Sequence, residues 1–205
     1  MKTLVIGANG QIGRLYCRMA GEAGADIRAL VRADKQLQFF ESLGVEAVVG
    51  DLEGDFSHSF DGCAQVVFTA GSGGKTGGDK TLLVDLYGAI RAIDIGVARG
   101  IEHFVMVSAM RVEKPLLAPE SMRHYMVAKK LADEHLVRSG LAYTILRPGR
   151  LTDIAATGRV RSDGGGTDIS RENVALCIQA ALAAASTGGR SIDLLDGQTP
   201  IAELF

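Results

Sequence analysis

The sequence is poor in features that mark several kinds of protein. Its 205 residues include three cysteines, Cys17, Cys63 and Cys177, with no CxxC pair, so we expect reduced thiols rather than a disulfide framework. The net charge of −2 provides no electrostatic argument for a nucleic acid or anionic membrane partner. No apolar run approaches the roughly 20 residues of a membrane helix, and the N-terminus has a strand pattern rather than that of a signal peptide. These absences predict a soluble, cytoplasmic protein.

The sequence also lacks the short motifs of several enzyme classes. The four histidines are scattered without ligand spacing and no HExxH is present, so we expect no metal site. No GxSxG surrounds Ser108, which argues against a hydrolase. Gly74-Lys75-Thr76 matches the end of a P-loop, but the preceding glycine is misplaced and no helix follows directly.

Strand and helix patterns alternate along the whole chain. Hydrophobic residues make up 47% and charged residues 22%, which is typical of a globular protein. We expect strands at 2–7, 26–32, 45–49, 65–70, 103–108, 142–147 and near 190–195, and helices at 11–23, 34–43, 79–99, 121–139 and 171–185. Gly24, Gly44, Gly100 and Gly140 stand where helix C-caps are wanted. The repeated βα unit predicts an α/β fold, a Rossmann-like doubly wound parallel sheet, as a single domain over 1–205.

A glycine-rich turn joins the first expected strand to the first helix. Gly7 permits a tight turn, Gly10 lets the backbone approach a pyrophosphate at the helix N-terminus, and Gly13 permits close packing of helix on strand. An ordinary βα turn is the alternative, but the position at the start of the chain favours a dinucleotide site. The cofactor-binding residues predicted in this turn are Gly7, Asn9, Gly10, Gln11, Ile12 and Gly13.

The choice of cofactor is predicted by two arginines. Arg32 ends the second strand, where proteins that bind NAD usually place an acidic residue, and Arg14 follows the third glycine. Guanidinium groups suit a 2′-phosphate, so we expect NADP(H) to be preferred over NAD(H). Alternatively, both are solvated and Arg32 pairs with Asp34. Asp51, followed by Leu52, borders the expected adenine pocket, where it either accepts from the adenine amino group or caps the next turn.

Tyr125 and Lys129 share one face of a helix, four residues apart. A nearby ammonium lowers the pKa of a phenol and makes it a better acid–base catalyst for protonating a carbonyl oxygen. Ser108 ends the preceding strand, at the edge where open α/β sheets carry their active sites, and its hydroxyl is suited to orient a substrate carbonyl. The alternative is a half-buried tyrosine, a solvated lysine and a turn-forming serine.

Together these motifs make the chain resemble the atypical short-chain dehydrogenases/reductases. It is similar to their small NAD(P)H-binding group, which includes NmrA-like proteins and flavin/biliverdin reductases. The resemblance rests on Gly7-Ala-Asn-Gly10-Gln-Ile-Gly13, Gly50-Asp51-Leu52, Val107-Ser108, Tyr125-x-x-x-Lys129 and Arg147-Pro148-Gly149. It implies a nicotinamide over Ser108 and Tyr125, with Lys129 on its ribose hydroxyls. It also implies cofactor contacts from Ala70, Gly71 and Pro148.

The chain departs from the family pattern at two places. Thr69-Ala70-Gly71 replaces the family's Asn-Asn-Ala-Gly, and Asp85 stands where the family often has asparagine, which puts the usual proton relay in doubt. We expect no substrate domain of the kind that extended members carry, and therefore a small or open substrate pocket from 110–121 and 150–167.

Two functions follow as hypotheses. The first is an NADPH-dependent oxidoreductase that reduces a small carbonyl, quinone or flavin-like acceptor, with Tyr125, Lys129 and Ser108 as catalytic residues. The second is an NADP(H)-binding redox sensor or regulatory module without turnover. A small-molecule substrate is the expected partner, and the sequence leaves the substrate's identity and the oligomeric state open.

Overall fold

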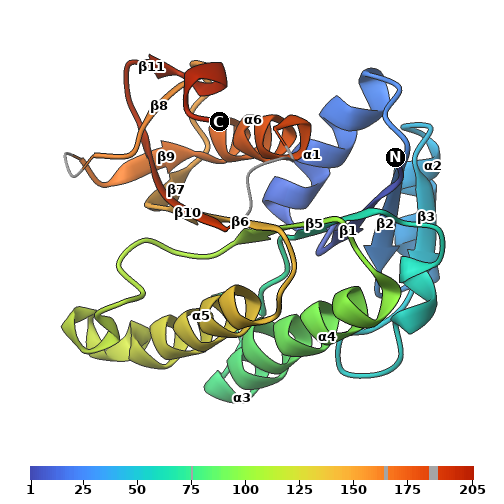
Figure 1. Cartoon of the computed structure of the whole chain (residues 1–205), viewed down its shortest axis with the longest axis horizontal. Coiled ribbons are helices and arrows are strands. Elements are labelled where there is room, and N and C mark those ends of the chain that lie inside the picture. The colour runs from blue at the N-terminus through green and yellow to red at the C-terminus, as the bar shows by residue number, and fades with distance from the viewer. Residues whose placement is uncertain (75, 164–165, 185–188) are drawn as a thin grey trace.

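The computed structural model describes residues 1–74, 76–163, 166–184 and 189–205. Over these residues nine strands form one sheet in the order β11-β8-β10-β6-β5-β4-β1-β2-β3. Helices cover both faces: α1 and α6 lie on one side, and α4 and α5 on the other (Figure 1). The predicted α/β, Rossmann-like fold is confirmed.

Seven strands of the sheet are parallel. They are β1 (Thr3–Ile6), β2 (Ile27–Val31), β3 (Glu46–Val49), β4 (Gln65–Phe68), β5 (His103–Val107), β6 (Tyr143–Pro148) and β10 (Arg190–Asp196). Each coincides with a strand expected from the sequence. β1 pairs with both β2 and β4, so the strand order reverses there. Open α/β sheets bind their ligands beyond the carboxyl ends of the strands at such a reversal.

The helices also follow the predicted segments. They are α1 (Gln11–Glu22), α2 (Leu37–Glu41), α3 (Gly78–Lys80), α4 (Ala89–Arg99), α5 (Glu120–Arg138) and α6 (Arg171–Ala183). The expected end of the last helix, residue 185, lies outside the described residues. All four predicted C-cap glycines have positive φ, between 66° and 83°, as left-handed helix ends require.

Two features were not predicted. The helix expected at 79–99 has a π-helical stretch, Thr81–Gly88, between α3 and α4. The stretch from 150 onward contains short strands, β7 (Arg150–Thr152), β8 (Arg159–Arg161) and β9 (Asp168–Ser170), and β11 (Thr199–Pro200) follows later. β8 pairs antiparallel with β10 and β11, and β7 pairs with β9 in a small second sheet. Strands of two or three residues show no local periodicity, and long-range pairing alone forms them.

The core consists of two apolar layers, one on each face of the sheet. Along β1, Val5 packs in the layer beneath α1 and α6, whereas Leu4 and Ile6 pack in the layer beneath α4 and α5. This alternation follows from the pleat of a strand. Each fully buried aliphatic or aromatic side chain contributes about 1.5–3 kcal/mol, so both layers hold the carboxyl edge of the sheet in place.

Candidate functional site: two adjacent cavities at the carboxyl edge

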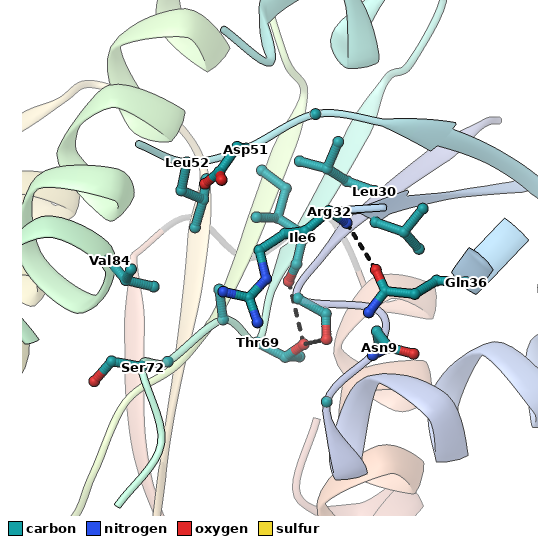
Figure 2. Close-up of a pocket in the computed structure, with 16 residues that line it drawn as sticks. Ile6, Asn9, Leu30, Arg32, Gln36, Asp51, Leu52, Thr69, Ser72 and Val84 are labelled. Atoms are coloured by element: carbon teal, nitrogen blue, oxygen red, sulfur yellow. Dashed lines mark hydrogen bonds between the residues drawn. The ribbon is translucent and has the colours of Figure 1, made fainter. Parts of the chain in front are cut away.

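The first cavity opens where the strand order reverses, between the loops that follow β1, β2, β3 and β4 (Figure 2). It has a volume of about 200 Å³. Eight of the predicted cofactor residues line it: Gly7, Asn9, Gly10, Arg32, Asp51, Leu52, Ala70 and Gly71. Sequence reasoning missed the others, which include Leu30, Gln36, Thr69, Ser72 and Val84. We call this the nucleotide cavity.

Two glycines of the turn between β1 and α1 lie so close to other main-chain atoms that a larger residue would clash. A Cβ on Gly7, which has φ of +85°, would lie 2.4 Å from the backbone nitrogen of Ala70. A Cβ on Gly13 would lie 2.4 Å from the carbonyl oxygen of Gly7. Gly13 therefore packs the helix against the strand, as predicted, and does not line the cavity.

The N-terminus of α1 is suited to an anion. Gly10 is its N-cap, no side chain caps the helix, and its first turn contains no acidic residue. The first N–H groups of a helix lack partners within the helix and carry the positive end of its dipole. Because Gly10 also lines the cavity, the residues present fit the pyrophosphate of a dinucleotide. Gln11 is exposed and Ile12 packs against the core, and neither lines the nucleotide cavity, so their contact with a cofactor stays a prediction.

The two predicted arginines lie differently. The guanidinium of Arg32 points from the end of β2 into the cavity (Figure 2). The backbone nitrogen of Arg32 donates to Oε1 of Gln36 at 2.9 Å, and the described residues show no ion pair with Asp34. Arg14 does not line the cavity: its Nε and Nη2 donate to Oδ1 of Asn9, and it lies 4.3 Å from the ring centroid of Phe39.

Asp51 and Leu52 form the wall of the nucleotide cavity opposite Asn9. Oδ1 of Asp51 accepts from the backbone nitrogen of Glu53 at 3.0 Å, which is the turn-capping alternative. Asp51 nevertheless lines the cavity, so a second carboxylate oxygen is available to a ligand. The structure therefore shows the turn-capping role, and acceptance from the adenine amino group stays a prediction.

The second cavity lies beyond the ends of β5 and β6, next to the first, and has a volume of about 490 Å³. Its lining residues come from the ends of β5 and β6 and the positions directly after them, from the two segments expected to form a substrate pocket, and from α5 and α6. They are Ser108, Ala109, Met110, Arg111, Met122, Tyr125, Met126, Pro148, Gly149, Arg150, Leu151, Thr167 and Arg171. We call this the catalytic cavity, because Ser108, Tyr125 and Pro148 meet in it.

The pKa of Tyr125 is shifted upward, contrary to the expected effect of Lys129. Burial raises its pKa above the ordinary value, and the charges of Asp85 and Asp133 raise it further. The expectation that Lys129 lowers this pKa is therefore wrong, because burial and two carboxylates raise it and Lys129 is not among the groups that shift it. Nζ of Lys129 donates to the carbonyl oxygen of Val107 at 2.8 Å. Lys129 is 2% exposed and lines neither cavity, and its burial lowers the pKa of its ammonium.

Beneath the catalytic cavity, Asp133 is hydrogen-bonded to Arg147 and lies near Ser108. Its Oδ2 accepts from Nε of Arg147 at 3.0 Å. Burial raises the pKa of the Asp133 carboxyl, and the neighbouring Ser108 hydroxyl opposes that rise. Oγ of Ser108 and Oδ1 of Asp133 are both buried, and neither has a hydrogen-bond partner of ordinary geometry among the described residues. The Ser108 hydroxyl thus lies toward α5, and its role in orienting an acceptor stays a prediction.

Asp85 lies between the two cavities on the π-helical stretch. Its Oδ2 accepts from the backbone nitrogen of Ser72 at 2.9 Å, and a Cβ on Gly71 would lie 3.0 Å from Oδ1. Asp85 therefore holds the loop that follows β4 against the nucleotide cavity, while its charge reaches Tyr125. π-helical turns often mark functional sites.

Within the described residues, no group of three or more histidine, cysteine or carboxylate side chains is arranged to hold a metal ion. No described helix combines the length and the hydropathy needed to cross a membrane. Cys17 and Cys177 are buried, which raises the pKa of each thiol to about 12, and Cys63 is half-buried.

The fold and the nucleotide cavity define a nicotinamide-dinucleotide-binding protein with an arrangement typical of atypical short-chain dehydrogenases/reductases. A family model described as NAD(P)H-binding matches residues 7–185. The chain belongs to this NAD(P)H-binding family, and the resemblance noted from its motifs is confirmed.

Relatives cover nearly the whole chain. The uncharacterized sugar epimerase YhfK of Bacillus subtilis is 46% identical over 209 residues, covering 99% of this chain and 98% of its own. A solved structure from Bacillus halodurans, assigned as an NAD-dependent epimerase/dehydratase, is 42% identical with a TM-score of 0.95 and covers 100% and 98% of the two chains. The oxidoreductase ylbE of Lactococcus lactis is 26% identical, with a TM-score of 0.89 and coverage of 99% and 94%.

Proposed function

We propose that the protein is an NADPH-dependent oxidoreductase that reduces a small carbonyl, quinone or flavin-like acceptor in the catalytic cavity. The observation that carries this proposal is the position of the Tyr125 phenol in the wall of a cavity next to the nucleotide cavity. A reduced nicotinamide bound there would supply a hydride to the acceptor.

Tyr125 then donates its phenolic proton to the acceptor oxygen as negative charge develops on it. The phenol is protonated at neutral pH and is therefore available as the general acid, although its raised pKa makes it a weaker acid than a free tyrosine. Lys129 lies one helical turn away, with one N–H held by Val107. A charge on Lys129 would stabilise the phenolate that is left. Its contact with the ribose hydroxyls of the cofactor stays an expectation from the family resemblance, because Lys129 lines neither cavity.

The preference for NADPH is supported by Arg32, whose guanidinium points into the nucleotide cavity without an ion-pair partner among the described residues. Arg14 adds positive charge behind Asn9. The Bacillus halodurans relative is described as NAD-dependent. Direct titration of both cofactors therefore decides this part of the proposal.

The proposal is tested by following NADPH oxidation with a panel of carbonyls and quinones. We expect Tyr125→Phe to lower kcat roughly a hundred- to ten-thousand-fold while the Kd for NADPH stays unchanged. Tyr87→Phe is the matched control, because Tyr87 is 54% exposed and lines neither cavity.

Equal turnover of wild type and Tyr125→Phe would remove Tyr125 from the mechanism. NADPH binding without reduction of any acceptor would instead favour the second candidate, a redox sensor. Interconversion of a nucleotide sugar with no net consumption of cofactor would favour an epimerase, the activity named for the Bacillus subtilis relative.

A further inference from the structure

The catalytic cavity has an unusual charge composition. Among its thirteen lining residues are three arginines, Arg111, Arg150 and Arg171, and no aspartate or glutamate. The remaining walls are largely apolar, with Met110, Met122, Met126 and Leu151 among them. Methionine side chains adapt to ligands of different shape, so the cavity combines an apolar body with positive charge at its edge.

Two of the three arginines are neutralised by carboxylates outside the cavity lining. Arg150 forms a bidentate pair with Asp168, with Nε and Oδ1 2.9 Å apart. Arg171 donates through Nη1 to Oδ1 of Asp153 at 2.7 Å. These two guanidinium groups already have partners and help to hold the walls formed by β7 and α6.

Arg111 differs from both. It is exposed, and no ion pair or side-chain hydrogen bond joins it to another described residue. The charge of Arg111 opposes the rise in the pKa of Asp193, although the two side chains form no ion pair. Within the described ranges it is also the non-glycine residue with positive φ, at 66°.

Positive φ at Arg111 is informative because an L side chain is strained there and glycine would relieve the strain. Strained residues of this kind concentrate at ligand sites, where the surrounding structure holds them in place. A long cationic side chain at a position suited to glycine, in the wall of the catalytic cavity, therefore indicates a use for its charge.

We propose that Arg111 binds an anionic group, a carboxylate or a phosphate, on a substrate whose apolar body occupies the methionine-lined cavity. This inference rests on the proposed function, since it names the substrate class of the same cavity. The cofactor's own phosphates do not account for Arg111, because the two cavities share no lining residue and the helix N-terminus belongs to the nucleotide cavity.

The test is a binding titration that does not depend on turnover. Naphthoate, naphthyl phosphate and neutral naphthamide are titrated by calorimetry into the full chain saturated with NADP⁺. We expect at least one of the two anions to bind roughly ten-fold or more tightly than naphthamide. Arg111→Asn, which keeps a residue that tolerates positive φ, should abolish that difference.

Arg99→Gln is the matched control, because it removes one positive charge at an exposed pair with Asp61, outside the catalytic cavity. It should leave all three titrations unchanged. In parallel, NADPH-dependent reduction of carboxybenzaldehyde is compared with that of its methyl ester, and Arg111→Asn should raise KM for the acid alone.

The two proposals fail in different ways. Arg111-dependent binding of an anion without NADPH-dependent reduction of any carbonyl, quinone or flavin supports the anionic site and overturns the oxidoreductase. Reduction of the ester and the acid with equal KM, together with equal binding of all three probes to wild type and Arg111→Asn, overturns the anionic site and leaves the oxidoreductase standing. A stronger response to naphthyl phosphate than to naphthoate assigns the anionic group as a phosphate, and the reverse assigns a carboxylate.

Discussion

The nucleotide cavity and the catalytic cavity lie side by side at the carboxyl edge of the sheet, but they are built differently. The nucleotide cavity is shaped by the main chain of four loops, with glycines where backbones approach each other. The catalytic cavity is shaped by side chains from the loop after β5, the end of β6, α5, β7 and α6. The first therefore depends on local sterics, and the second depends on packing between distant segments.

The two cavities also differ in what lies beneath them. Under the catalytic cavity lie Asp85, Lys129 and Asp133, each 2% exposed. Under the nucleotide cavity the support is close contact between Gly7, Gly13 and the neighbouring loops. Buried charges make one cavity sensitive to electrostatic changes, whereas close backbone contacts make the other sensitive to a single added methyl group.

The largest expected loss of stability comes from removing one of the charges beneath the catalytic cavity. Asp133→Ala leaves the side chain of Arg147, which is 16% exposed, without its buried partner at 3.0 Å. Breaking a buried ion pair on one side costs about 3–5 kcal/mol, which a urea unfolding curve measures. Glu113→Ala removes the exposed partner of the same arginine and should cost about 0–1 kcal/mol. Equal losses in the two variants would mean that burial does not set the strength of these pairs.

The next effect concerns the nucleotide cavity. Gly7→Ala places an L side chain at positive φ, with its Cβ 2.4 Å from the backbone of Ala70. We therefore expect the free energy of unfolding to fall by about 2–4 kcal/mol and cofactor binding to be lost. Gly24→Ala is a matched control: its φ is +67°, but nothing lies within 4 Å of the added Cβ. Gly24→Ala should lower the free energy of unfolding by about 1–2 kcal/mol and leave cofactor binding intact. If Gly24→Ala also abolishes binding, the contact with Ala70 is not the cause.

A smaller effect tests the proposed cofactor choice. Arg32→Asp should weaken NADPH binding roughly ten-fold or more, because a charge-assisted contact is lost and a carboxylate repels the 2′-phosphate. Affinity for NADH should hold or rise, since the carboxylate accepts from the ribose hydroxyls. Arg32→Gln separates lost attraction from new repulsion. A wild type that prefers NADH, or equal weakening of both cofactors, would contradict the assignment of Arg32.

The smallest effect lies away from both cavities, at the amino end of β5. His103 is buried, Nε2 lies 3.0 Å from Oγ1 of Thr144, and burial lowers the pKa of the ring. The unfolded chain therefore binds this proton more readily. The contribution of His103 to the free energy of unfolding is fully present above the unfolded-state pKa near 6.5. As the pH falls below that value, the free energy of unfolding decreases by at most about 1.4 kcal/mol per pH unit.

Unfolding curves between neutral pH and pH 5 measure this slope. His103→Gln should flatten it, whereas His124→Gln, at an exposed position, should not. A slope that persists unchanged in His103→Gln would assign the acid sensitivity to other groups.

Much of the fold was predictable, for reasons visible in particular segments. The strands from β1 to β6 and β10 are short apolar runs, and Gly24, Gly44, Gly100 and Gly140 end helices or turns by a local backbone preference. The strands β7, β8 and β9 were missed because each has three residues and exists through pairing with distant partners. The π-helical stretch was missed because its sequence has the composition of an ordinary helix.

The same division holds for the two cavities. The sequence by itself determined the glycine turn, the position of Arg32 and the class of cofactor, because a strand, a tight turn and a helix N-terminus follow from neighbouring residues and their sterics. The tertiary structure alone decided that burial raises the pKa of Tyr125, that the Ser108 hydroxyl lies near Asp133, and that three arginines line one cavity. A pKa and a cavity wall depend on burial and on charges acting through space, and these come from residues far apart in the chain.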